Sequence, residues 1–173
     1  MKILLLYAAA GGGHKRAAQA MEAYLQEHLP GAQVRVEDAL QHVGRAVNAL
    51  CCDGYKFSAK HAPQIFGSLY HSTNRDTKFA GLLPRVNGML ARKLLPLIEE
   101  FQPDVILDTY HFAGQMVSRL KEQGRVSAPL VNVVTDYGPH MAWLAPEVDA
   151  YVVATESLRD DFVQMGAPQE RIY

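Results

Sequence analysis

The chain has 173 residues, 49% of them hydrophobic and 20% charged, which is typical of a single soluble globular domain and excludes a low-complexity chain. Its formal net charge of −1 gives no support to nucleic-acid binding, and no stretch approaches the roughly 20 apolar residues of a membrane-spanning helix. The two cysteines, Cys51 and Cys52, are adjacent, a spacing that suits neither a disulfide nor a zinc site and favours a reducing cytosol.

The start of the chain predicts a strand, a helix and a second strand. Residues 2–9 form a continuous apolar run, as expected of a strand covered on both faces; a secretory signal would need a more basic start. Residues 17–29 carry apolar side chains at helical spacing until Pro30 and Gly31, and residues 33–38 have the pattern of a strand. Such a unit is typical of a parallel sheet with a right-handed crossover.

The middle of the chain, residues 41–101, breaks this alternation and concentrates positive charge. Between Lys56 and Lys93 there are seven basic residues and one acidic residue, a net charge of +6 against −7 for the rest. This asymmetry suggests an anionic partner, although a solvated surface explains it equally well. Insertions of this kind usually carry recognition. The last part, residues 86–101, predicts a helix that Pro96 kinks or divides.

The alternation of strands and helices then resumes. We expect strands over 103–110, 128–136 and 149–155, and helices over 113–123 and 156–165. Together with the first unit, this pattern predicts an α/β fold in which a Rossmann-like doubly wound parallel sheet forms one domain over residues 1–173.

Three glycines follow the first predicted strand, and a histidine begins the next helix. In a doubly wound sheet this first turn is the usual place for a ligand. Gly11, Gly12 and Gly13 allow a ligand to approach the backbone, and the helix N-terminus at His14 favours an anion. A dinucleotide motif, G-x-G-x-x-G, is only partly matched because Arg16 occupies the third glycine position, and the P-loop spacing is absent.

His14 permits a further interpretation. A histidine beside a flexible turn, at the mouth of a cleft, can take a proton from the hydroxyl group of an acceptor. A tight turn with no chemical role explains the same residues equally well.

Two later loops carry polar residues directly after predicted strands. One holds Thr135, Asp136, His140 and Trp143, and the other holds Asp108 and His111. Because parallel strands end at the same edge of a sheet, we expect both loops to lie beside the glycine turn. Any single member could be structural, so the agreement of the three loops is what favours a site.

Four segments of the chain resemble one known family: AAAGGGHKRAAQAM, PDVILDTYHF, VVTDYGPHMAW and YVVATESLRDDFVQMGAPQERIY. They are similar to the N-terminal domain of monogalactosyldiacylglycerol synthases and bacterial processive diacylglycerol glucosyltransferases. The resemblance covers most of the chain and is weakest over residues 41–83. It implies the N-terminal, acceptor-binding half of a GT-B glycosyltransferase, whose C-terminal domain binds a UDP-sugar. That second domain is absent from this sequence, so we expect this chain alone to be inactive.

The resemblance also implies a reaction and its residues. It implies inverting transfer of a hexose from a UDP-sugar to diacylglycerol in glycolipid synthesis, with no resident cofactor, no metal and no nucleic-acid partner. It implies a cytoplasmic protein, peripheral on the inner face of the cell membrane. The implied general base is His14, and the implied cleft loop beside the donor phosphates consists of Gly11, Gly12 and Gly13. The residues implied to bind the acceptor are His111, Asp136, His140 and Trp143. The residues implied to face the membrane are Arg85, Arg92 and Lys93.

Two other classes stay open at this point. One is a nucleotide- or dinucleotide-binding Rossmann domain that transfers no sugar. The other is a module that binds a membrane or a protein without chemistry in a cleft.

Overall fold

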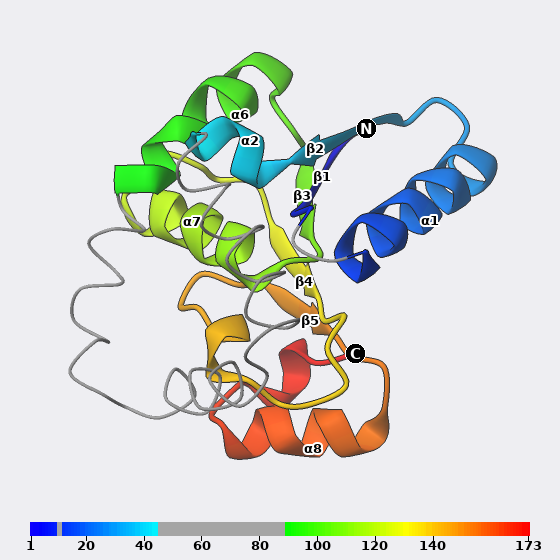
Figure 1. Ribbon diagram of the computed structural model, residues 1–173, viewed down its shortest axis with the longest axis vertical. Coiled ribbons are helices and arrows are strands. Elements are labelled where there is room, and N and C mark those ends of the chain that lie inside the picture. Colours follow the sequence, from blue (N-terminus) through cyan, green and yellow to red (C-terminus); the bar gives the residue numbers. More distant parts are fainter. Residues whose placement is uncertain (10–11, 45–88) are drawn as a thin grey trace, which may run out of the picture.

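The computed structural model describes residues 1–9, 12–44 and 89–173. Its centre is a five-stranded sheet in the order β2-β1-β3-β4-β5, in which all neighbouring strands run parallel (Figure 1). The strands are β1 (Lys2–Tyr7), β2 (Gln33–Asp38), β3 (Val105–Asp108), β4 (Leu130–Val133) and β5 (Ala150–Val152). The strand order steps outward from β1 in both directions, as the predicted doubly wound sheet requires.

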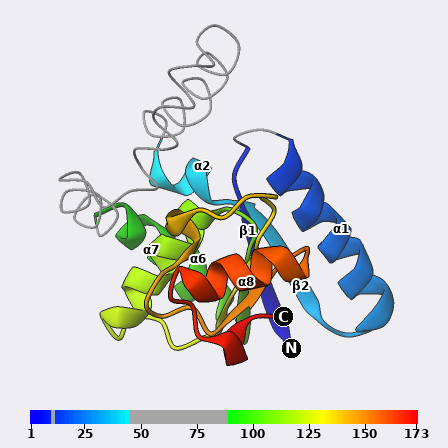
Figure 2. The same ribbon diagram turned by 90° about the horizontal axis from the view of Figure 1, so that it is seen from below.

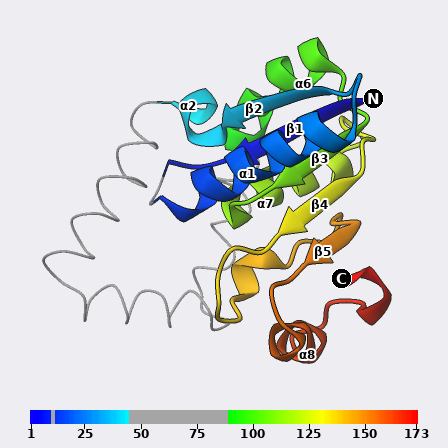
Figure 3. The same ribbon diagram turned by 90° about the vertical axis from the view of Figure 1, so that its right-hand side faces the viewer.

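Helices connect these strands on both faces of the sheet. They are α1 (Gly13–His28), α2 (Ala39–Val43), α6 (Leu95–Phe101), α7 (His111–Glu122) and α8 (Glu156–Gln164), with short 3-10 turns at η2 (Arg92–Leu94), η3 (Met141–Trp143) and η4 (Gln169–Arg171). The views in Figures 2 and 3 show α1 on one side of the sheet and α6 and α7 on the other. In the described part of the chain, no helix has the length and apolar character needed to cross a bilayer.

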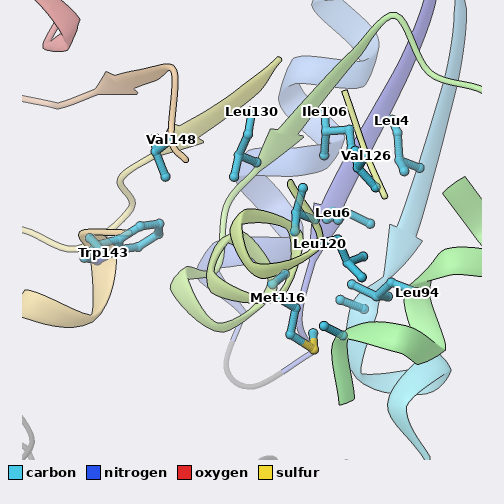
Figure 4. Packing of buried hydrophobic residues seen from close by; sticks show 14 of the residues in the cluster. Leu4, Leu6, Leu94, Ile106, Met116, Leu120, Val126, Leu130, Trp143 and Val148 are labelled. Atoms are coloured by element: carbon cyan, nitrogen blue, oxygen red, sulfur yellow. The ribbon is translucent and has the colours of Figure 1, made fainter. Parts of the chain in front are cut away.

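A continuous hydrophobic core lies on the side of the sheet that faces α7, which we call the α7 side (Figure 4). Leu6 of β1 and Ile106 of β3 are fully buried there, as are Met116 and Leu120 of α7. The predicted division at Pro96 is confirmed, because this proline lies in the first turn of α6, directly after η2.

The opposite face, which we call the α1 side, is covered less completely. Here α1 packs over β1 and β2, and Leu5 and Ala18 are fully buried. Further along the sheet Leu107 and Val131 are only partly buried, and Val152 is 39% exposed. A shallow apolar pocket of about 300 Å³ opens between α1 and the sheet, lined by Ala20, Met21, Tyr24, Leu25 and Leu107.

Most of the predicted basic insertion at 41–101 lies outside the described residues. Its last part is α6, and Leu95, Leu97 and Ile98 of that helix are buried against the core. Lys93 is exposed, but its Nζ donates to the carbonyl oxygen of Val43 at 2.9 Å. This bond gives a partner to a carbonyl group in the last turn of α2.

Candidate functional site

The glycine turn opens α1 at the carboxyl edge of β1. Gly12 and Gly13 are exposed, and a Cβ built at either would meet no atom of the described residues within 4 Å. The backbone at Gly12 has φ −96°, a value that any residue adopts. Packing against residues 1–9, 12–44 and 89–173 therefore does not require glycine here, and these residues leave the space beside the turn open. Gly11 lies outside the described residues.

The imidazole ring of His14 is half-buried and held at one nitrogen. Its Nδ1 lies 2.7 Å from the carbonyl oxygen of Thr109 and 2.8 Å from Oγ1 of Thr135. A carbonyl oxygen can only accept, so the hydrogen sits on Nδ1, and the Thr135 hydroxyl can itself donate to the Thr109 carbonyl at 3.2 Å. With Nδ1 protonated, a neutral ring carries its free lone pair on Nε2. This nitrogen is the basic atom of the site.

The end of β3 also fixes the backbone of His14. The Thr109 hydroxyl lies 3.0 Å from the carbonyl oxygen of His14 and 3.3 Å from that of Leu6. The Tyr110 ring meets the imidazole edge-on, with centroids 5.0 Å apart. Sequence reasoning did not single out Thr109 or Tyr110, although they stand between Asp108 and His111 in a loop that it had selected.

The loop after β4 is held by its own side chains. Trp143 is fully buried, and its Nε1 donates to Oδ2 of Asp136 at 2.8 Å. His140 is 5% exposed, and its Nδ1 accepts the amide hydrogen of Ala142 at 3.0 Å, which caps η3. The indole of Trp143 therefore orients Asp136 and presents no surface to a ligand.

His111 begins α7 and joins the two loops. Its ring stacks on His140 with centroids 6.0 Å apart, meets Trp143 edge-on at 5.6 Å and lies 4.8 Å from the Tyr110 ring. Burial lowers the pKa of His111 to about 4, although the nearby charge of Asp136 acts in the opposite direction. The ring is therefore neutral at pH 7. Its Nδ1 is buried and has no hydrogen-bond partner in the described part of the chain.

The structure thus brings the predicted residues together at the carboxyl edge of the sheet. Tyr110 contacts both the His14 ring and the His111 ring, so His14 and the histidine–tryptophan cluster lie in one continuous group of side chains. In residues 1–9, 12–44 and 89–173, no three His, Cys, Asp or Glu side chains are grouped so as to hold a metal ion. Arg92 is exposed on η2, and Arg85 lies outside the described residues.

Comparisons with known proteins identify the family of the chain. The family model described as monogalactosyldiacylglycerol (MGDG) synthase matches residues 14–173. The processive diacylglycerol beta-glucosyltransferase of Staphylococcus epidermidis is 30% identical over 172 residues, which cover 99% of this chain and 42% of that protein. The protein of the same name from Staphylococcus carnosus is 29% identical over 177 residues, with the same coverage. The chain spans about 42% of the length of these curated relatives.

A solved structure is similar along the whole chain. The apo form of the lipopolysaccharide outer core galactosyltransferase WaaB aligns with a TM-score of 0.59 and 11% identity, covering 100% of this chain and 44% of that one. The predicted fold class, an α/β fold with a Rossmann-like doubly wound parallel sheet, is confirmed. The resemblance stated from the sequence is confirmed as well: the chain belongs to the monogalactosyldiacylglycerol synthase family, and its coverage of the relatives fits an N-terminal domain.

Proposed function

We propose that this chain is the acceptor-binding half of a lipid glycosyltransferase in which His14 is the general base. The observation that carries the proposal is the 2.7 Å contact between Nδ1 of His14 and the carbonyl oxygen of Thr109, which assigns the ring hydrogen to Nδ1. Because the Thr109 carbonyl receives Nδ1–H at 2.7 Å, the basic lone pair of His14 is on Nε2, beside a glycine turn open to a ligand.

The proposed reaction is an inverting transfer of a hexose from a UDP-sugar to diacylglycerol. The acceptor oxygen forms a bond to the anomeric carbon while the bond from that carbon to the diphosphate breaks, and UDP leaves with the electron pair. The hydroxyl proton passes to Nε2 of His14. The resulting imidazolium keeps its Nδ1–H bond to the Thr109 carbonyl, which stabilises the new positive charge. The positive end of α1 favours the negative charge that develops on the departing diphosphate.

The proposal divides the substrates between two parts of a longer protein. The relatives named as glucosyltransferases are more than twice as long as this chain, which spans about 42% of them. We propose that the additional part binds the UDP-sugar, and that residues 1–173 alone do not turn over because the donor is not positioned. His111, Asp136 and His140 line the acceptor side in this account. Trp143 acts through Asp136 as a positioning residue.

A substitution of His14 tests the proposal in the full-length protein. We expect His14→Ala to lower the rate of hexose transfer from UDP-sugar to diacylglycerol in vesicles by about 10²–10⁴-fold, the usual contribution of a general base. His28→Ala is the matched control, because His28 lies on the same helix, is exposed, and contacts Tyr24 one turn away, whose carbonyl oxygen lies 3.0 Å from its Nδ1. A folded His14→Ala protein with the wild-type rate would exclude this role.

A weaker effect is expected from Thr135→Val. The substitution removes the hydroxyl group 2.8 Å from Nδ1 but leaves the Thr109 carbonyl in place. One neutral hydrogen bond is worth about 1 kcal/mol, so we expect about a fivefold to tenfold lower kcat. A loss as large as that of His14→Ala would mean that Thr135, and not the Thr109 carbonyl, sets the position of the hydrogen.

We further propose that the protein lies on the inner face of the cell membrane as a peripheral protein. Tyr137 is 92% exposed and Met141 is 43% exposed, and both lie in the loop that holds Asp136. Apolar side chains beside the site suit the acyl chains of an acceptor, and exposed Arg92 suits anionic lipid. Co-sedimentation of the intact protein with anionic vesicles tests this idea. Binding should weaken as salt rises; salt-independent binding, or none, would contradict the electrostatic part.

A further inference from the structure

Two buried polar atoms on neighbouring strands have no hydrogen-bond partner among the residues that the structure describes. Asp108 of β3 and Asn132 of β4 are paired in register, and both are fully buried on the α7 side. Oδ1 of Asp108 accepts the amide hydrogen of Tyr110 at 2.9 Å, and Nδ2 of Asn132 donates to the carbonyl oxygen of Trp143 at 3.0 Å. The remaining oxygens, Oδ2 of Asp108 and Oδ1 of Asn132, have no partner in the described part of the chain.

Both of these oxygens lie beneath Gly114 in the first turn of α7. A Cβ built on Gly114 would lie 2.6 Å from Oδ2 of Asp108 and 2.7 Å from Oδ1 of Asn132, so both atoms crowd the same point. Helix α7 comes so close here that no side chain fits. Oxygen lone pairs gathered at one buried point repel each other, and each unpaired group costs about 1–3 kcal/mol. A hydrogen atom between the two oxygens removes both penalties at once.

Only Asp108 can carry that hydrogen. The amide of Asn132 is oriented by the Trp143 carbonyl, which needs a donor and so keeps Nδ2 on its own side and Oδ1 toward Asp108. Burial raises the pKa of Asp108 well above its usual value, and the backbone N–H groups of Tyr110 and Gly114 counteract this only partly. The Gly114 N–H is near enough to the carboxyl group to act on its pKa, but its hydrogen bond goes to the Tyr110 carbonyl at 3.4 Å, and Oδ2 accepts no hydrogen bond in the described part of the chain. No charged side chain of the described residues is among the causes of the shift.

We propose that Asp108 is a neutral carboxylic acid in the folded protein and that its Oδ2–H donates a hydrogen bond to Oδ1 of Asn132. This bond joins β3 to β4 under the first turns of α7. At one end, the Asp108 side chain holds the amide of Tyr110, next to the Thr109 carbonyl that orients His14. At the other end, Asn132 holds the backbone of Trp143, whose indole holds Asp136.

The pair is therefore a positioning device beneath both loops of the site. It concerns the location of a proton in the resting protein and does not depend on glycosyl transfer. The conservative substitution Asp108→Asn reproduces the neutral acid, because an amide offers one acceptor atom to Tyr110 and one donor atom to Asn132.

Infrared difference spectroscopy on the full-length protein at neutral pH tests the proposal directly. We expect the wild-type spectrum minus that of Asp108→Asn to contain the carbonyl band of a protonated carboxylic acid. The control is Asp160→Asn, since Asp160 is exposed on α8 and its loss should leave that band unchanged. A difference spectrum that contains only carboxylate bands would overturn the proposal, because Asp108 would then be ionised and the Asn132 amide turned to donate to it.

Thermal unfolding gives a second test that does not need spectroscopy. Asp108→Asn should melt within about 2 °C of the wild type, whereas Asp108→Leu, similar in size but unable to bond, should melt at least about 5 °C lower. Asn132→Leu should show a comparable loss. A melting temperature of Asp108→Asn as low as that of Asp108→Leu would contradict the neutral pair, because the amide would then fail to replace the acid.

Discussion

The two sides of the sheet differ in how completely they are covered, and the candidate site depends mainly on one of them. On the α7 side Ile106 and Met116 are fully buried, and so are the polar side chains of Asp108 and Asn132. On the α1 side Leu107 is only partly buried. Parallel sheets normally bury both faces, so the α7 side has the packing of a finished core and the α1 side does not. The loops that carry the site are anchored by the buried polar groups of the finished side.

Substitutions at two neighbouring residues of β3 should show the largest difference in stability between the two sides of the sheet. Ile106 and Leu107 are consecutive in β3 and point to opposite sides. We expect Ile106→Ala to lower the free energy of unfolding by about 2–5 kcal/mol and Leu107→Ala by about 1 kcal/mol, because the half-exposed side chain loses less buried area. Urea unfolding followed by circular dichroism measures both. Equal losses in the full-length protein would mean that another part of it covers the α1 side.

Two buried groups on the α7 side, His111 and Asp108, should change the stability of the protein with pH in opposite directions. The folded pKa of His111 is about 4, below its ordinary value of 6.5, so the unfolded chain binds more protons in between. Stability should therefore fall as pH drops from 6.5 to 4, by at most about 3 kcal/mol from this group. Asp108 acts in the opposite direction: its folded pKa is raised, so its contribution is present at acid pH and is lost as pH rises.

Single variants separate the contributions of His111 and Asp108 to the change of stability with pH. His111→Phe keeps a ring in place but does not titrate, and unfolding at several pH values should show a flatter acid limb than that of the wild type. Asp108→Asn should steepen the acid limb, because it removes the group that opposes His111. Parallel curves for the wild type and His111→Phe would show that the histidine is not held neutral.

A substitution at Gly114 tests how closely α7 packs against the sheet. We expect Gly114→Ala to destabilise the protein by about 1–3 kcal/mol, because the new methyl group overlaps Oδ2 of Asp108 and Oδ1 of Asn132, and these atoms belong to buried, constrained side chains. Thermal unfolding checks the direction. The opposite result, a helix stabilised by alanine, would show that the strands yield easily and that the buried pair is loosely held.

The order of the elements was predictable because alternating apolar runs and amphipathic stretches repeat along the chain. Their ends were less predictable. The predicted strand 128–136 stops at Val133, although Val134 still donates its amide hydrogen to Val152 at 2.8 Å. Beyond this point the chain leaves the sheet, which brings Thr135 to His14. The length of a ladder depends on the neighbouring strand, and that strand is distant in the sequence.

In the site as well, some features could be predicted from the local sequence, whereas others depend on residues that are distant in the sequence. His14 could be selected from its place after a strand and a glycine turn. The burial of Trp143 could not, since a tryptophan after a strand can face inward or outward. Gly114 looks like an ordinary helical glycine until the distances to Asp108 and Asn132 are known. Each of these facts depends on side chains from other elements, which no local pattern contains.

A second glycine gives the smallest expected change in stability and the clearest contrast with Gly114. Gly13 begins α1, and none of the described residues occupies the space beside it, so Gly13→Ala should stabilise the protein by about 0.5–1 kcal/mol through a better helix former and a less flexible unfolded chain. Under the proposed function the same methyl group stands where a sugar diphosphate approaches the backbone, and hexose transfer should fall. Unfolding and transfer assays on one preparation measure the two effects together. A variant that is more stable and fully active would mean that the ligand does not approach this turn.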